Sequence, residues 1–210
     1  FKLPQHYFFA MLLVILALAG WEWTHFLHGK RHWAWNVVEI AVLVALGFLA
    51  VFPPAWIIAI IGELWWIGVL FWLIYINKNA MISPLPNYLL RILAVITLIP
   101  FVAVVFVLQA QPVLLLLLLI IVWLADSSAY FGGRLFGKHK LAATISPNKT
   151  IEGAVSAFIV AACFLPLVMW LFHASGNNLT PWIVLLFSTT IAAIIGDLFE
   201  SFLKRQAGVK

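Results

Sequence analysis

Charged residues are scarce in this sequence. Only 9% of the 210 residues are Asp, Glu, Lys or Arg, whereas 65% belong to the hydrophobic set. A typical soluble domain has about 25% charged residues and roughly 45–50% apolar ones. The chain has too few polar groups to cover the surface of a globule in water. This composition excludes a soluble domain, a disordered chain and a nucleic-acid-binding module.

Cysteine is almost absent. The single cysteine, Cys163, lies in an apolar stretch. One thiol cannot form a disulfide within the chain, which excludes a fold stabilised by internal disulfides. The apolar surroundings in the sequence predict a buried structural role for Cys163.

Long apolar runs dominate instead. A helix needs about 20 apolar residues to cross the roughly 30 Å hydrocarbon layer of a membrane. We predict an all-α polytopic membrane protein with seven spans, separated by proline-, glycine- and asparagine-rich breaks. The predicted spans are 7–27, 36–52, 55–76, 91–108, 112–132, 151–172 and 180–203. We expect an N-terminal region of four spans over 1–110 and a second region over 111–210, with a polar loop over 133–150 that carries the chemistry.

The basic residues are distributed asymmetrically between the predicted loops. Lysine and arginine are enriched in the cytoplasmic loops of membrane proteins. Here they occupy the first, third and fifth loops and the segment after the last span, and only Lys2 falls on the other side. We therefore expect the N-terminus outside and the C-terminus inside, with loop 133–150 on the cytoplasmic face.

Carboxylates inside the predicted spans are candidates for function, because a charge there costs roughly 2.5–3.5 kcal/mol on insertion scales. Glu22, Glu39 and Glu63 lie in the first three spans, and their roles are left open between a paired or protonated structural carboxylate and a functional one. Asp126 and Asp197 differ from them, since their sequence neighbours are also polar.

Asp126 begins a polar segment in the fifth span. Asp126, Tyr130 and Gly133 share one helix face by their spacing. The pair Gly132-Gly133 permits close approach of another helix or of a ligand. This pattern indicates either a ligand-contacting face or a hydrogen-bonded node between helices.

A second polar stripe ends the seventh span. Its members recur at helical spacing and are Asp197, Glu200, Ser201, Lys204 and Arg205. Asp197 and Asp126 lie at about the same depth, roughly 24 Å and 21 Å from the outer helix starts. Carboxylates are ligands for Mg²⁺, and the two bases are suited to a phosphate. The alternative interpretation is a ladder of surface salt bridges.

The predicted loop adds basic residues and an anion-binding helix start to these two acidic stripes. Four bases fall within it, at Arg134, Lys138, Lys140 and Lys149. The segment 146–150 leads directly into the sixth span, whose free N–H groups favour an anion. Glu152 follows in the first helical turn, where it is suited to cap the helix, hold a metal ion or bind a substrate hydroxyl. Neither a Walker motif nor G-x-G-x-x-G is present, so a P-loop or Rossmann nucleotide site is excluded.

Four motifs in this order resemble the phosphatidate cytidylyltransferase (CDP-diacylglycerol synthase) family in its bacterial form. They are Ala-Asp-Ser-Ser-Ala-Tyr at 125–130, Leu-Phe-Gly-Lys-His-Lys-Leu at 135–141, Ser-Pro-Asn-Lys-Thr-Ile-Glu-Gly at 146–153 and Gly-Asp-Leu-Phe-Glu-Ser-Phe-Leu-Lys-Arg at 196–205. The resemblance is specific over 123–210. The N-terminal half resembles the family only in hydropathy and in the stretch 21–23.

This resemblance implies transfer of the cytidylyl group of CTP to phosphatidate, giving CDP-diacylglycerol and pyrophosphate, at the cytoplasmic face of a bacterial inner membrane. It implies Asp197 as a Mg²⁺ ligand, and Asp197, Lys149 and Asp126 as catalytic residues. The implied substrate-binding residues are Ser146, Thr150, Glu152, Lys138, Arg134, Tyr130, Glu200, Ser201, Lys204 and Arg205. The family signature continues past Lys210 with an aspartate for a second ion, so we expect residues 1–210 alone to lack part of the site.

The expected partners are therefore CTP, phosphatidate and membrane lipid, with no nucleic acid, and a homodimer is left open. Three alternatives also fit the residues. A CTP-dependent polyprenol or lipid kinase would phosphorylate an alcohol. An ion-coupled transporter would use the intramembrane carboxylates as a relay. A structural subunit would bind no nucleotide.

Overall fold

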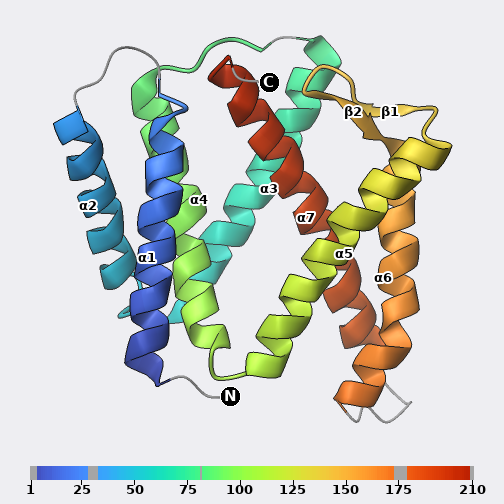
Figure 1. Cartoon of the computed structure of the whole chain (residues 1–210), viewed down its shortest axis with the longest axis horizontal. Coiled ribbons are helices and arrows are strands. Elements are labelled where there is room, and N and C mark those ends of the chain that lie inside the picture. The colour runs from blue at the N-terminus through green and yellow to red at the C-terminus, as the bar shows by residue number, and fades with distance from the viewer. Residues whose placement is uncertain (1–3, 28–32, 81, 173–178, 209–210) are drawn as a thin grey trace. The chain divides into compact units, whose positions relative to one another are not determined.

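Seven helices and one β-hairpin make up the part of the chain that the computed structural model describes, residues 4–27, 33–80, 82–172 and 179–208 (Figure 1). The helices are α1 (Gln5–Thr24), α2 (Trp33–Leu49), α3 (Ala55–Asn79), α4 (Asn87–Leu108), α5 (Pro112–Phe136), α6 (Ile151–Leu171) and α7 (Thr180–Gln206). The strands are β1 (Lys140–Ala142) and β2 (Ser146–Thr150).

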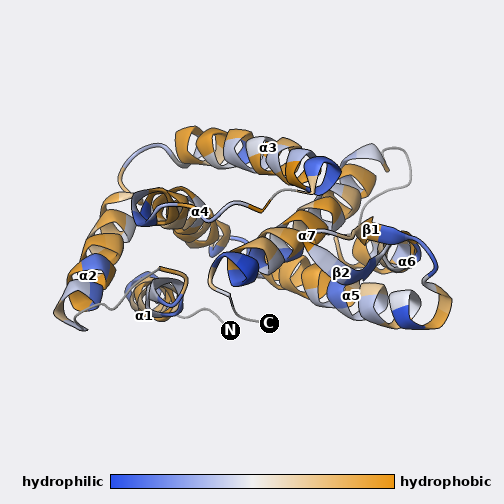
Figure 2. Ribbon diagram, turned by 90° about the horizontal axis from the view of Figure 1, so that it is seen from above, coloured by the Kyte–Doolittle hydropathy of each residue, from blue (hydrophilic) through white to orange (hydrophobic). Residues whose placement is uncertain are grey.

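These helices have the length and composition of membrane spans. Six of the described helices are long and apolar enough to cross a bilayer, and α2, with 17 residues, is a shorter apolar helix. Apolar residues predominate along the helices (Figure 2), and many large apolar side chains are exposed, such as Trp123 at 79%. Exposure of this kind is favourable in lipid. The predicted all-α polytopic membrane fold is confirmed.

Two details of the prediction were wrong. Cys163 is exposed rather than buried, because it lies on an outward face of α6, where an apolar side chain needs no protein partner. The fifth helix does not end at 132 but continues to Phe136, and residues 140–150 form a hairpin rather than an irregular loop. Gly132 and Gly133, which the sequence pattern associated with close approach of another helix or of a ligand, lie within this helix.

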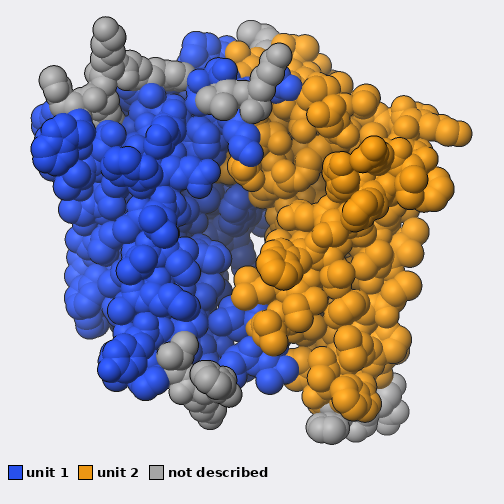
Figure 3. Space-filling model, in the orientation of Figure 1, with its two compact units in different colours: residues 1–69, 83–115, 203–210 blue, residues 70–82, 116–202 orange. Residues whose placement is uncertain are grey.

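The chain divides into two compact units (Figure 3). Unit 1 comprises residues 1–69, 83–115 and 203–210, and unit 2 comprises residues 70–82 and 116–202. In unit 1, α1, α2 and α4 pack side by side, with Leu12, Leu16 and Leu90 buried. The expected division of the chain near residue 110 stays a prediction.

Close approach between α5 and α6 organises unit 2. A Cβ atom placed on Gly153 would lie 2.5 Å from the carbonyl oxygen of Ala129 and 3.3 Å from the Cα of Gly133. Gly132 faces Ser156 in the same way. Small residues allow membrane helices to come together at this range. The two helices are therefore in tight contact at the residues next to the hairpin.

Hydrogen bonds attach the hairpin to the helices around it. Its strands pair antiparallel, with Lys140 opposite Thr150. Thr150 also caps α6, because its hydroxyl accepts the backbone N–H of Gly153 at 3.1 Å. The turn is anchored on the end of α3, where the N–H of Thr144 donates to Oδ1 of Asn77 at 3.1 Å.

Candidate active site

A cavity of about 490 Å³ opens in unit 2 among α5, the hairpin, the start of α6 and α7. Its polar lining comes from α5, the hairpin and α7, and the start of α6 adds Gly153 and Ala154. The polar lining residues are Asp126, Tyr130, Arg134, Ser146, Asn148, Lys149, Thr150 and Asp197. Strand β2 of the hairpin supplies four of these eight, so half of the polar lining comes from one short segment.

An ion pair joins the hairpin to α7 within this cavity. The ammonium of Lys149 contacts a carboxylate oxygen of Asp197, and both side chains are about one-third exposed, at 29% and 31%. Burial lowers the pKa of Lys149 below its ordinary value, while the nearby carboxylates of Asp126 and Glu200 act in the opposite direction. Lys149 thus lies in a cluster of acidic groups from α5 and α7.

Hydrogen-bonding groups flank the charged cluster. Arg134 Nη1 donates to the hydroxyl of Tyr130, one helical turn earlier on α5, at 3.3 Å. Ser146 and Asn148 line the cavity from β2. This set of a guanidinium, an ammonium, hydroxyls and an amide matches the needs of a polyphosphate and a sugar.

The acidic groups fit a hard divalent cation. Mg²⁺ is usually bound by one or two carboxylates and takes its remaining oxygens from water and substrate phosphates. Asp126 and Asp197 supply two carboxylates to one cavity. Across the described residues there is no cluster of three or more His, Cys, Asp or Glu side chains suited to a metal ion. The arrangement therefore suits a metal that arrives with a phosphate ligand better than a permanent all-protein site.

Seven of the predicted site residues line this cavity. They are Asp126, Tyr130, Arg134, Ser146, Lys149, Thr150 and Asp197. Glu200 is not part of the lining, yet it lies near enough to act electrostatically on Lys149 and Asp126. The three residues predicted to be catalytic, Asp126, Lys149 and Asp197, are thus brought together by the fold.

Other predicted residues lie elsewhere. Glu152 accepts hydrogen bonds from the backbone N–H groups of Lys138 and His139 and bonds Nδ1 of His139 at 2.6 Å. Glu152 therefore connects residues 138–139, just before the hairpin, to the first turn of α6. The residue that caps α6 is Thr150. The side chain of Lys138 does not line the cavity, nor does Ser201 of α7. Lys204 and Arg205 lie in the last turn of α7, which belongs to unit 1.

Sequence reasoning missed two residues. Asn148 lines the cavity, and its place inside the motif at 146–153 was the available signal. His139 is the partner of Glu152 across 13 residues, and no sequence pattern indicated that pairing. Hydrogen bonds between a strand entrance and a helix start depend on the hairpin register, which the sequence pattern did not give.

Comparison with known proteins identifies the family of this chain. Residues 1–210 match the model of the Cytidylyltransferase family. The chain belongs to this family. It is 34% identical to the phosphatidate cytidylyltransferase of Haemophilus influenzae, over 97% of this chain and 80% of that protein.

Shorter matches concentrate on part of the chain. Phosphatidate cytidylyltransferases of Staphylococcus saprophyticus and Staphylococcus epidermidis are 44% and 47% identical over 93 residues, which is 43% of this chain and 35% of each relative. No solved structure matches significantly. The family predicted from the four motifs is confirmed, and with it a nucleotidyltransferase of membrane phospholipid synthesis. Members of this family generally use Mg²⁺.

Proposed function

We propose that this integral membrane protein transfers the cytidylyl group of CTP to phosphatidate, releasing pyrophosphate and forming CDP-diacylglycerol. The observation that carries the proposal is the meeting of Asp126, Lys149 and Asp197 in one cavity. The substrates are those implied by the name that the long and the short matches share, phosphatidate cytidylyltransferase.

Charge balance explains how the cavity accepts a polyanion. Its lining has two carboxylates, Asp126 and Asp197, and two cations, Arg134 and Lys149, so its formal charge is zero. Asp197, with Asp126, would hold Mg²⁺, which when bound neutralises phosphate charge and stabilises the pyrophosphate leaving group. Lys149 and Arg134 then remain to bind phosphate oxygens.

The reaction needs orientation more than proton transfer. A phosphate oxygen of phosphatidate, already anionic, attacks the α-phosphorus of CTP. The new P–O bond forms as the bond to the bridging oxygen of the β-phosphate breaks, and pyrophosphate leaves with that electron pair. Lys149 and Arg134 hold the triphosphate for in-line attack, and Ser146 and Asn148 are placed to bind the sugar or base.

An adjoining apolar cavity is suited to the lipid substrate. It measures about 340 Å³ and shares Leu141, Ala154 and Ile194 with the polar cavity. Its remaining walls are almost entirely apolar, with Phe158 and Ile195 among them. We place an acyl chain of phosphatidate here and its phosphate in the polar cavity. The roles predicted for Lys204 and Arg205 at the lipid phosphate stay predictions.

The proposed location is the cytoplasmic face of a bacterial inner membrane, where CTP is available. The distribution of lysine and arginine among the loops supports this orientation. A homodimer also stays a prediction, which chemical cross-linking in the membrane checks.

A labelled-CTP assay tests the function. Purified protein, phosphatidate and CTP labelled in the α-phosphate are incubated with and without Mg²⁺. We expect Mg²⁺-dependent transfer of label into the lipid phase, with pyrophosphate released. A parallel reaction uses CTP labelled in the γ-phosphate, and label that enters lipid only in that reaction would indicate a lipid kinase instead. Absence of transfer both in this chain and in a chain extended past Lys210 would refute the proposal.

Asp197→Asn tests the metal assignment within the same assay. We expect turnover to fall by at least about 100-fold, because the amide is a poor ligand and provides no charge for the cation. The matched control is Glu63→Gln, the same acid-to-amide change at an exposed helix position in unit 1. Near wild-type turnover in Asp197→Asn would overturn the assignment.

A further inference from the structure

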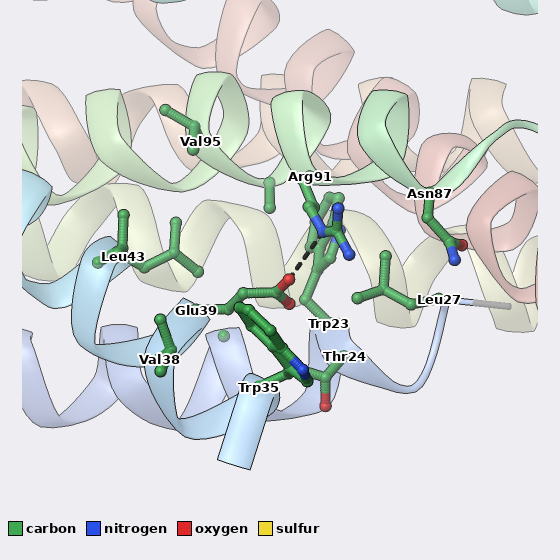
Figure 4. A pocket seen from close by; sticks show the side chains of 13 residues that line it. Trp23, Thr24, Leu27, Trp35, Val38, Glu39, Leu43, Asn87, Arg91 and Val95 are labelled. Carbon is green, nitrogen blue, oxygen red and sulfur yellow. Dashed lines mark ion pairs between the residues drawn. The ribbon is translucent and has the colours of Figure 1, made fainter. Parts of the chain in front are cut away.

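A second cavity lies in unit 1, among α1, α2 and α4 (Figure 4). It has a volume of about 550 Å³, and none of the residues placed in the active site lines it. Its walls are mainly apolar, but they include a glutamate and an arginine. Glu39 was one of the span carboxylates whose role the sequence left open.

The polar groups of this cavity gather at one end of the three helices. Trp23 lies at the end of α1, Trp35 and Glu39 near the start of α2, and Arg91 in the second turn of α4. Tryptophan and arginine are typical of the boundary between hydrocarbon and headgroups. Farther along the helices the walls become apolar, with Val42 and Val95. The cavity thus has a polar mouth and an apolar continuation, as an amphiphile requires.

The arginine is only partly used by the protein. Its Nε lies 2.7 Å from Oε1 of Glu39, and the two side chains are 47% and 22% exposed (Figure 4). Among the described residues Arg91 has no other ion pair or hydrogen bond, so its two terminal nitrogens remain available as donors. Glu39 holds the guanidinium in place from its Nε side. A guanidinium oriented in this way presents two nitrogens to a phosphate.

The aromatic wall beside Arg91 is rigid. Trp23 is buried, and its Nε1–H donates to the carbonyl oxygen of Leu90 at 2.9 Å, which ties α1 to α4 next to the arginine. Its indole is therefore held in place as a flat apolar surface of the cavity. A fixed cation beside fixed apolar walls favours a ligand that combines a phosphate with hydrocarbon.

We propose that this cavity is a second lipid site, which binds one glycerophospholipid with its phosphate on the terminal nitrogens of Arg91 and an acyl chain along Val38, Val42 and Val95. The site is separate from the lining of the active-site cavity and does not depend on the proposed reaction. A soluble phosphate compound shares the headgroup chemistry but leaves the apolar walls uncovered.

Photo-crosslinking tests the proposal. The full chain in detergent micelles is titrated with phosphatidylglycerol that carries a diazirine on one acyl chain, and the labelled peptides are mapped by mass spectrometry. We expect saturable labelling of the α2 and α4 segments that line the cavity. Unlabelled phosphatidylglycerol should compete at least about tenfold better than diacylglycerol, which lacks the phosphate, or glycerol 3-phosphate, which lacks the acyl chains.

Two variants and a control locate the site. Val38→Trp fills the cavity from an exposed position, and Val37→Trp makes the same change at the neighbouring exposed residue, which does not line it. We expect Val38→Trp to reduce saturable labelling about tenfold and Val37→Trp to leave it unchanged. The double variant Glu39→Gln/Arg91→Gln, which removes both charges together, should lose the preference for phospholipid over diacylglycerol.

The opposite results would overturn the proposal. Labelling that does not saturate, or that is equal in Val38→Trp and Val37→Trp, indicates ordinary surrounding lipid. Competition by glycerol 3-phosphate equal to that of phosphatidylglycerol indicates a soluble phosphate ligand. Both measurements are independent of cytidylyl transfer, so they distinguish failure of this inference from failure of the proposed function.

Discussion

At the scale of single residues, Lys149 lies among charged groups from several elements in the active-site cavity. It comes from the hairpin, pairs with Asp197 of α7 and lies near Asp126 of α5. It therefore connects three elements through charge. The proposed role follows from that position, because a metal ion bound by Asp197 would release Lys149 from its ion pair to bind a triphosphate.

Lys149→Met is expected to raise the KM for CTP about tenfold or more, because a charge-assisted contact to the triphosphate is lost. Steady-state kinetics at saturating Mg²⁺ measures this change. Lys140→Met is the matched control, since Lys140 is exposed on the other strand of the hairpin and does not line the cavity. Equal KM values in the two variants would contradict the role assigned to Lys149.

Residue patterns predicted much of the chemistry but not the partners. The motif at 146–153, the polar stripes around Asp126 and Asp197, and the bases of the predicted loop indicated seven of the residues that line the cavity. They did not indicate that Glu152 holds His139, because that contact depends on the hairpin. A motif identifies residues that act together. Which of their side chains form hydrogen bonds depends on how the backbone between them folds.

At the scale of elements, the contact between α5 and α6 sets the shape of the active site. Gly133 and Gly153 lie against each other, and Thr150 caps α6 beside them. The capped helix start and the attached hairpin therefore take their positions from this contact. A methyl group added at this contact should therefore displace both the helix start and the hairpin.

Gly153→Ala is expected to destabilise the protein by about 1–3 kcal/mol and to reduce activity, because its Cβ would meet the backbone of α5. Thermal unfolding in micelles and the labelled-CTP assay measure the two effects. Gly68→Ala in α3 is the control, since nothing lies within 4 Å of a Cβ there. If Gly153→Ala is as stable and active as Gly68→Ala, the close contact does not shape the site.

The glycine pair in α5 shows how packing decides the length of a helix. The sequence associated this pair with close approach of another helix or of a ligand, while the predicted span ended at 132, and glycine weakens an isolated helix by up to about 1 kcal/mol. In unit 2 the same glycines allow α6 to pack closely against α5, and α5 continues without a break to Phe136. Helix-helix contact outweighed local propensity.

At the scale of the whole molecule, the distribution of basic residues makes the orientation testable. In a Cys163→Ala background, Ala143→Cys places a thiol on the exposed hairpin turn and Gln111→Cys places one between α4 and α5. With the hairpin inside, a membrane-impermeant maleimide added to intact cells should label Gln111→Cys, but label Ala143→Cys only after permeabilisation. The reverse pattern would invert the proposed topology.

The sequence by itself determined the class of the molecule and the family, because hydropathy and contiguous motifs are local properties of the chain. Apolar runs predicted the spanning helices, and four motifs predicted a cytidylyltransferase. Only the tertiary structure joined Lys149 to Asp197 and paired Glu39 with Arg91, 52 positions apart. These pairs arise from helix packing, since the direction of a side chain toward a distant partner depends on how helices rotate against one another.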